Sequence, residues 1–308
     1  MYFLLYKILE RRIGMNQKIE ILCVGAQKAG TTSLHNILKN HPQIELPYIK
    51  EIYYFSDDKE YRSLSNLHRH YSFEAGKVAM NITPSNMCND LAIQRIYEYN
   101  PNMKIIMLLR NPTNRVISQY RMRYRNFNEK RSLSEVISDE IDSRIFEKRA
   151  CSSLLYRSMY SQQIKHIQSF FPKEQLYYVL FEEFSKNQKR VIDDLLNWCQ
   201  LPVFDFEHVH SNEKFNGSKN ILWRIATKIP HKLVLRIQEI FKVNLRQLVK
   251  SHVKKDMIQP LIDEATVLRL QYFFKETIDE TERLTGLNLD IWRNSTSKTG
   301  DKHASKSI

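Results

Sequence analysis

The chain has 308 residues, 42% of them hydrophobic and 11% aromatic, which is enough for one large domain or two small ones with a sizeable core. Its formal net charge of +13 indicates an anionic ligand or surface, a class that includes nucleotides, sulfated glycans, nucleic acids and acidic membranes. The four cysteines are widely spaced without a C-x-x-C pair, which argues against a disulfide framework or a cysteine zinc site and favours a reducing compartment.

Residues 1–16 are expected to form a short amphipathic lead. Their apolar run is only a few residues long, whereas a transmembrane helix needs ~20 apolar residues. The lead also lacks the basic region and small-residue cleavage site of a signal peptide. We therefore expect a cytoplasmic protein.

Residues 19–38 predict a strand, a tight polar loop and the start of a helix. Such a junction gathers unpaired backbone N–H groups at the positive end of a helix dipole, and therefore binds anions. Gly25 and Gly30 have the spacing of a phosphate-binding P-loop, but the residue after Gly30 is Thr31. The lysine, Lys28, stands inside the loop instead, so its ammonium should meet a different part of the ligand.

The remaining pattern alternates strands with helices, which predicts an α/β, P-loop-like, three-layer αβα fold around a mainly parallel sheet of about five strands. The expected strands after the first lie at 44–46, 76–82, 103–109 and 175–181. The expected helices lie at 90–99, 132–149, 152–170, 182–199 and 261–284. A further helix is expected to begin at Pro112, with Asn111 as its N-cap. Ligands of such sheets bind at the carboxyl ends of strands, where Lys28 and Arg110 both fall.

A different pattern follows the last strand and its helix. Residues 219–255 hold ten Lys or Arg and one acid, with the basic residues spaced by four along a helical pattern that Pro230 divides. Residues 294–308 are Ser/Lys-rich and expected to be disordered. No repeat or linker interrupts 17–293, which predicts a single domain.

Three motifs in order carry a resemblance to a known family. They are Gln27-Lys28-Ala29-Gly30-Thr31-Thr32-Ser33-Leu34, then Lys50-Glu51-Ile52-Tyr53-Tyr54-Phe55, then Arg110-Asn111-Pro112 with Arg115, Ser118 and Tyr120. The chain resembles the PAPS-dependent sulfotransferases, in the branch that includes carbohydrate (heparan-type) and bacterial enzymes. Leu284-Thr285-Gly286 with Leu289 and Trp292 extends the resemblance, which covers residues 19–293.

The resemblance implies a co-substrate, 3′-phosphoadenosine 5′-phosphosulfate (PAPS), and no metal. It implies that the first loop holds the 5′-phosphosulfate, and that Arg110 and Ser118 bind the 3′-phosphate. The loop residues concerned are Gln27, Lys28, Ala29, Gly30, Thr31, Thr32 and Ser33. Lys28 is placed to stabilise the charge that grows on the leaving oxygen. Glu51 stands where the carbohydrate branch has its general base, which removes the proton of the attacking hydroxyl.

The acceptor is expected to be a hydroxyl on a saccharide or glycolipid. One departure affects this expectation, because many relatives carry charged residues where this chain has Asn81-Ile82 before Thr83-Pro84. A second departure is Ser158, which stands for the glycine of a family R-G-x-Y segment.

Two other function classes are compatible with parts of this sequence. A P-loop kinase or NTPase needs Lys after Gly30 and an acidic Mg²⁺ ligand at a strand end, where this chain has Thr31 and Leu109-Arg110. A non-enzymatic basic protein could use 219–255 to bind membrane or nucleic acid. That stripe could contact anionic lipid peripherally, hold an anionic glycan or be a solvated helix face. Aromatic residues interleaved with basic ones are not evident, so no nucleic acid is expected.

Overall fold

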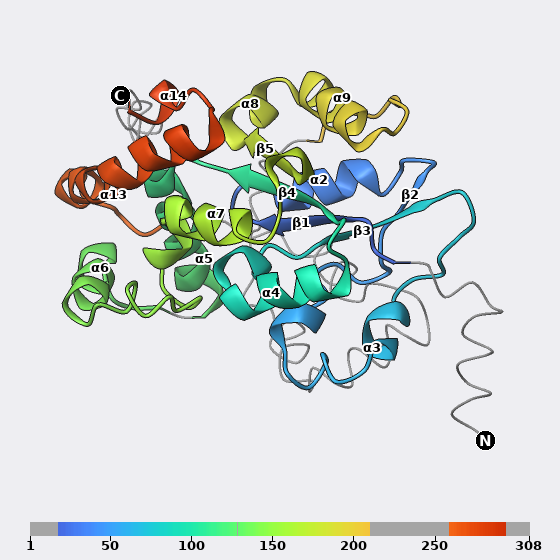
Figure 1. Cartoon of the computed structure of the whole chain (residues 1–308). Coiled ribbons are helices and arrows are strands. Elements are labelled where there is room, and N and C mark those ends of the chain that lie inside the picture. The colour runs from blue at the N-terminus through green and yellow to red at the C-terminus, as the bar shows by residue number, and fades with distance from the viewer. Residues whose placement is uncertain (1–17, 128, 210–258, 294–308) are drawn as a thin grey trace, which may run out of the picture. The chain divides into compact units, whose positions relative to one another are not determined.

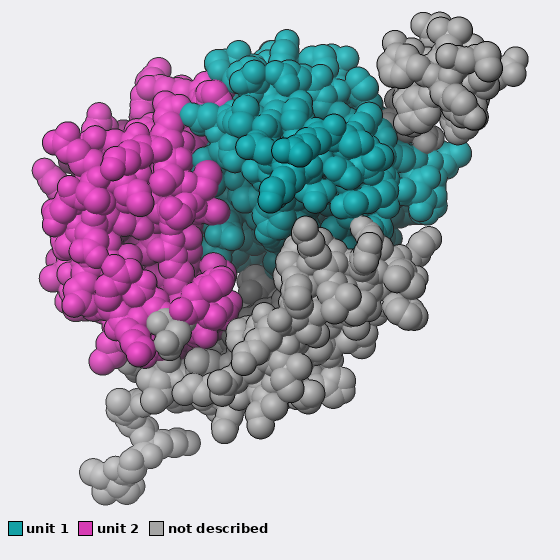
Figure 2. Space-filling model, turned by 90° about the horizontal axis from the view of Figure 1, so that it is seen from below, with its two compact units in different colours: residues 1–110, 167–258 teal, residues 111–166, 259–308 magenta. Residues whose placement is uncertain are grey.

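The computed structural model describes residues 18–127, 129–209 and 259–293 (Figure 1). These residues group into two compact units (Figure 2). The first unit takes its described part from residues 18–110 and 167–209, and the second from 111–166 and 259–293. The single domain expected from the sequence stays a prediction.

A five-stranded, wholly parallel sheet forms the centre of the first unit. The strand order is β2-β3-β1-β4-β5, and the strands are β1 (Ile21–Gly25), β2 (Ile44–Glu45), β3 (Val78–Ile82), β4 (Lys104–Leu109) and β5 (Leu176–Leu180). Every residue of β1 is buried, and so is β4 after Lys104, as expected of apolar strands covered on both faces. The predicted α/β class and strand number are confirmed.

The strand order places helices on both faces of this sheet. The crossover through α2 (Thr31–Leu38) leads from β1 toward the β2 edge, whereas that through α4 (Asp90–Tyr99) leads from β3 back past β1 to β4. Because both crossovers are right-handed in such sheets, opposite directions put the two helices on opposite faces, as Figure 1 shows. Short elements complete this part of the unit: α3 (Ser65–His68) and the 3₁₀ turns Tyr54–Ser56, Asn86–Cys88 and Lys173–Gln175.

A loop-anchoring carboxylate holds the segment before β3 in the same unit. Glu45 is buried and accepts hydrogen bonds from the backbone N–H groups of Ser72, Phe73 and Glu74, at 2.5, 3.0 and 2.8 Å. A buried acceptor of this kind satisfies the backbone N–H groups of a loop that forms no helix or sheet hydrogen bonds.

One helix expected in the first unit is interrupted. The pattern predicted a helix over 182–199, but the chain forms α8 (Phe181–Lys186) and α9 (Gln188–Cys199). Asn187 lies between them with φ −133° and ψ 61°, outside the helical region. The Gln188 side chain pairs with the backbone of Val209 through both its amide atoms, which fixes the break.

The second unit consists of helices. It contains α5 (Pro112–Asn126), α6 (Leu133–Asp142), the 3₁₀ turn Tyr156–Ser158, the start of α7 (Tyr160–Gln168), α13 (Glu264–Thr285) and α14 (Asp290–Arg293). Asn111 caps α5 by accepting from the Asn114 N–H, and Pro112 occupies the first turn, as predicted.

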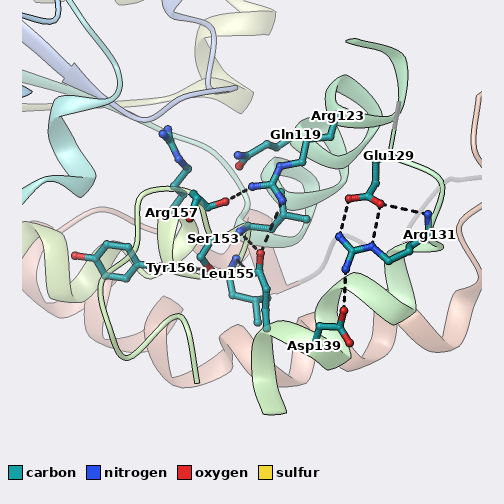
Figure 3. A network of polar contacts seen from close by, with 12 residues as sticks. Gln119, Arg123, Glu129, Arg131, Asp139, Ser153, Leu155, Tyr156 and Arg157 are labelled. Carbon is teal, nitrogen blue, oxygen red and sulfur yellow. Dashed lines mark hydrogen bonds and ion pairs between the residues drawn. The ribbon is translucent and has the colours of Figure 1, made fainter. Parts of the chain in front are cut away.

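Two predictions in the second unit were too long. The helix expected over 132–149 ends at Asp142, and the helix expected over 152–170 begins only at Tyr160. The first helix cannot continue through Arg144, which has φ +48°. The second starts late because the buried carboxylate of Glu140 accepts from the N–H groups of Leu154 and Leu155 and from the Ser153 hydroxyl. These donors, of which Ser153 and Leu155 are labelled in Figure 3, are therefore bound to a side chain rather than to helical carbonyls.

Several expectations fall outside the described residues. These are the lead at 1–16, the basic stripe at 219–255 and the tail at 294–308. Within the described ranges, the helices are all too short or too polar to span a bilayer.

Candidate functional site

The loop between β1 and α2 is shaped by its two glycines. Gly30 has φ +94°, and a methyl group added there would lie 3.0 Å from the Phe181 ring. A methyl group added to Gly25 would lie 2.6 Å from Cβ of Met87, closer than real contacts allow. Both positions therefore require glycine, one for its backbone conformation and the other for close approach.

The first turn of α2 presents backbone donors. Its first helical bond runs from the Leu34 N–H to the Gly30 carbonyl, so the three N–H groups of residues 31–33 precede the helical ladder. No side chain caps this end and no acidic residue lies in the first turn. Thr31 and Ser33 are buried whereas Thr32 is exposed, so the hydroxyl of Thr32 is the accessible one. The arrangement suits an anion.

One amide of the predicted cradle is used within the loop itself. The Ala29 N–H donates to the Ala26 carbonyl at 3.2 Å, and the Ala26 N–H donates to Leu108 of β4 at 2.7 Å. These bonds close the turn and tie it to the neighbouring strand. Gln27 is half-buried in the same turn.

Lys28 and Arg110 meet through the backbone of this loop. The Arg110 guanidinium follows β4 and donates to the Lys28 carbonyl at 3.0 Å. It also lies over the Phe181 ring, 4.5 Å from the centroid, at the carboxyl end of β5. Lys28 itself has φ +74°, a conformation that is uncommon for residues other than glycine. Lys28 and Arg110 thus both follow the carboxyl ends of strands, as expected, and their roles in binding stay predictions.

Glu51 is brought to the same place by Lys50. The Lys50 ammonium donates to Oε1 of Glu51 at 2.9 Å and to the Thr32 hydroxyl at 3.2 Å. The hydroxyl of Tyr53 donates to the other carboxylate oxygen, at 3.1 Å. The carboxylate is thus held by Lys50 on one oxygen and by Tyr53 on the other. The same lysine connects it to Thr32 in the first turn of α2. The backbone of Glu51 has φ +67°. Lys28 and Glu51 are two of the six non-glycine residues with positive φ in the described chain.

The departure at Asn81 contributes to positioning. Asn81 and Thr83 are fully buried, and the Thr83 hydroxyl lies 2.9 Å from Oδ1 of Asn81 and 3.1 Å from the Ile52 carbonyl. The end of β3 is thereby connected to the residue next to Glu51. Only the oxygen of the Asn81 amide is satisfied, because its Nδ2 atom is buried without a hydrogen-bond partner among the described residues.

Two buried groups beside the loop, His35 and Cys23, are held neutral. Burial, followed by the nearby charge of Lys50, lowers the pKa of His35 to about 4. Its Nδ1 atom has no hydrogen-bond partner within the described ranges. Burial raises the pKa of the Cys23 thiol to about 12, so this thiol is protonated and unsuited to nucleophilic attack.

The rest of the third motif lies in the second unit. Arg115 is fully buried and donates to the Ser158 hydroxyl, to Gln119 and to the Leu154 carbonyl. The side chain at position 158, which departs from the family glycine, thus accepts from a buried guanidinium and donates to the Pro112 carbonyl at 3.2 Å. These contacts hold the start of α5 in place.

The remaining predicted residue is on the same helix. Ser118 lies two turns into α5 and is half-buried. Because Arg110 belongs to the first unit, their joint binding of a phosphate stays a prediction. The C-terminal resemblance has a local basis, since Asn111 donates to the Trp292 carbonyl at 3.0 Å.

Sequence reasoning missed two contributors. The sequence places Tyr53 in the second motif without a role of its own, and Phe181 at the end of an expected strand. Their roles depend on contacts with Glu51 and with Gly30 and Arg110, which local periodicity does not encode. No cluster of three or more metal-ligating His, Cys, Asp or Glu side chains occurs in the described part of the chain. The expected absence of a metal stays a prediction.

Comparison with known proteins gives consistent matches. Residues 18–282 match the family described as "Sulfotransferase domain". The chain is 21% identical over 280 residues to heparan sulfate glucosamine 3-O-sulfotransferase 5 of Mus musculus, covering 90% of this chain and 75% of that protein. It is 22% identical over 222 residues to the bifunctional heparan sulfate N-deacetylase/N-sulfotransferase 1 of Caenorhabditis briggsae, covering 67% of this chain and 25% of that protein.

A solved structure has the same fold. The crystal structure of a sulfotransferase from Alicyclobacillus acidocaldarius superposes with a TM-score of 0.65 at 23% identity, covering 90% of this chain and 99% of that chain. The kinase or NTPase interpretation is not favoured by any of these matches.

Proposed function

The chain belongs to the sulfotransferase family, and from that premise we propose that it moves the sulfuryl group of PAPS to a hydroxyl of a saccharide or glycolipid. The observation that carries the proposal is the Lys50 bridge. It brings the carboxylate of Glu51 to the anion-binding N-terminus of α2, with distances of 2.9 and 3.2 Å from one ammonium to the two partners. A general base and an anion site side by side are what sulfuryl transfer needs.

The donor is held by the loop and by Arg110 in this proposal. The N–H groups that precede the helical ladder, with the Thr32 hydroxyl, bind the 5′-phosphosulfate. Arg110 already uses one N–H on the Lys28 carbonyl, and its fork binds the 3′-phosphate with Ser118. The family uses PAPS, and a donor with two phosphate positions fits two cationic sites at one sheet edge.

The chemical step assigns one role to each catalytic residue. The carboxylate of Glu51 takes the proton of the acceptor hydroxyl while the hydroxyl oxygen forms a bond to sulfur. The bond between sulfur and the bridging phosphate oxygen breaks, and the electron pair stays on that oxygen. The ammonium of Lys28 stabilises the resulting charge. The products are a sulfate ester and 3′-phosphoadenosine 5′-phosphate (PAP).

The acceptor class is proposed from the relatives. Both curated relatives are named for sulfation of heparan sulfate, one at an oxygen and the other at a nitrogen. We propose a saccharide or glycolipid hydroxyl for this chain. A cytoplasmic location, with peripheral contact to anionic membrane through 219–255, accompanies the proposal.

The test uses two variants and one charge control. Lys28→Ala and Glu51→Ala should each abolish transfer from PAPS, and Glu51→Ala should still bind PAP in a titration. Lys39→Met removes an exposed lysine at the other end of α2 and should leave both properties unchanged. Product mass spectrometry with saccharides, glycolipids and amino sugars identifies the acceptor. Full transfer by Glu51→Ala would show that the base is elsewhere, and ATP binding tighter than PAP in the presence of Mg²⁺ would refute the proposal.

A further inference from the structure

Lys50 has a second neighbour that its place beside Glu51 does not explain. Its ammonium lies 3.2 Å from the hydroxyl of Thr32, an exposed residue in the first turn of α2. The lysine side chain itself is only 19% exposed, so it is packed rather than extended into solvent. The ammonium is therefore fixed between the carboxylate and the anion-binding turn.

We propose that Lys50 contacts the co-substrate PAPS. Its ammonium binds the 5′-phosphosulfate directly, in addition to pairing with Glu51. The inference rests on the proposed function. An ammonium has three N–H donors, of which two are used, on Glu51 and Thr32. The third has no partner among residues 18–127, 129–209 and 259–293. An anion that accepts from the Thr32 hydroxyl would come within reach of that donor.

The charge balance of the turn supports this role. The first turn of α2 contains no charged side chain, so the turn itself supplies only N–H dipoles and hydroxyls. Lys50 adds a full positive charge in a partly desolvated place, where it is worth more than on the surface. Its field extends over the turn, because it contributes to the lowered pKa of His35, one turn further along the helix.

The proposal distinguishes the two phosphates of the nucleotide. Lys50 contacts the residues of the 5′ site, whereas Arg110 is the cation assigned to the 3′ site. Loss of Lys50 should therefore weaken ligands that carry a 5′-phosphate and spare those that carry only a 3′-phosphate. A lysine that merely shaped the loop would affect both classes alike.

The experiment measures dissociation constants of PAP and of adenosine 3′-monophosphate for four forms of the full chain: the natural protein, Lys50→Met, Lys50→Arg and Lys39→Met. Loss of a charge-assisted hydrogen bond should weaken PAP binding to Lys50→Met by roughly tenfold to a hundredfold. Binding of the 3′-monophosphate should change less than about twofold. The arginine variant should recover most of the PAP affinity, and Lys39→Met should behave as the natural protein.

The outcomes separate the inference from its premise. Unchanged PAP affinity in Lys50→Met, or an equal loss for both nucleotides, overturns the role of Lys50 while the proposed function stands. Absence of PAP binding in the natural protein and in Lys39→Met overturns the proposed function and this inference together. Retained binding of the 3′-monophosphate by Lys50→Met shows that the variant is folded.

Discussion

Gly30→Ala tests whether the anion loop depends on the glycine conformation described above. Gly30 has φ +94°, and its new methyl group would lie 3.0 and 3.3 Å from Phe181 and 3.3 Å from Phe184. An alanine in this left-handed region costs about 1–2 kcal/mol. Crowding against the packed rings adds about 1–2 kcal/mol, as overpacked sites commonly do. We expect a total loss of about 2–4 kcal/mol in the free energy of unfolding.

Gly76→Ala is the matched control in the same unit. Gly76 has φ +82°, but nothing lies within 4 Å of an added methyl group. It should lose only the conformational part, about 1–2 kcal/mol. Urea unfolding followed by circular dichroism measures both values. Gly30→Ala should in addition weaken PAP binding, since the Phe181 ring that it displaces supports Arg110.

A second-site change completes this test. Phe181→Leu in the Gly30→Ala background should recover part of the crowding term, because leucine fills less space beside the methyl group. The reasoning is refuted if Gly30→Ala is no less stable than Gly76→Ala and binds PAP as the natural protein does.

Three further outcomes are expected. Arg110→Ala should reduce the preference for PAP over adenosine 5′-monophosphate by roughly tenfold or more, as competition titrations would detect, whereas a parallel loss for both would indicate a role in holding the loop alone. Glu140→Gln should lower the free energy of unfolding by about 2–3 kcal/mol in urea titrations, because an amide offers one acceptor atom to three donors; an unchanged midpoint would contradict this. Burial lowers the pKa of both His35 and His70 to about 4, so stability should be full above about pH 6.5 and fall as the pH drops toward 4, by at most about 3 kcal/mol for each. Replacing either histidine with glutamine should flatten this dependence, and an equally steep curve would argue against it.

The sequence predicted elements well where a local rule applied. The buried runs of β1 and β4, the loop with its two glycines and the Asn111 cap were all visible from periodicity and turn chemistry. The predicted start of the helix over 152–170 was wrong because a side chain distant in the sequence accepts hydrogen bonds from the backbone there. Glu140 does this to residues 154 and 155, and no local pattern in 152–170 indicates it.

In the candidate site too, residues that are adjacent in the chain were predictable, whereas contacts between distant residues were not. Lys28 and its loop were predictable because strand, turn and helix are adjacent in the chain, and the resemblance pointed to Glu51. The sequence alone did not establish that the carboxylate reaches the loop. That contact requires residues 50–51 to cross to α2, which is fixed by the Thr83 hydroxyl at the Ile52 carbonyl and by the Lys50 bridge.

What the sequence by itself determined is thus the anion-binding junction, with its lysine inside the loop and its arginine at the end of β4. Short-range hydrogen bonding and hydrophobic periodicity are sufficient to specify such a junction. Only the tertiary structure decided which residues surround this junction: Glu51 is held by Lys50 and Tyr53, and Arg110 is supported by Phe181. The physical reason is that these contacts depend on the parallel strand order β2-β3-β1-β4-β5, which brings the ends of distant strands to one edge.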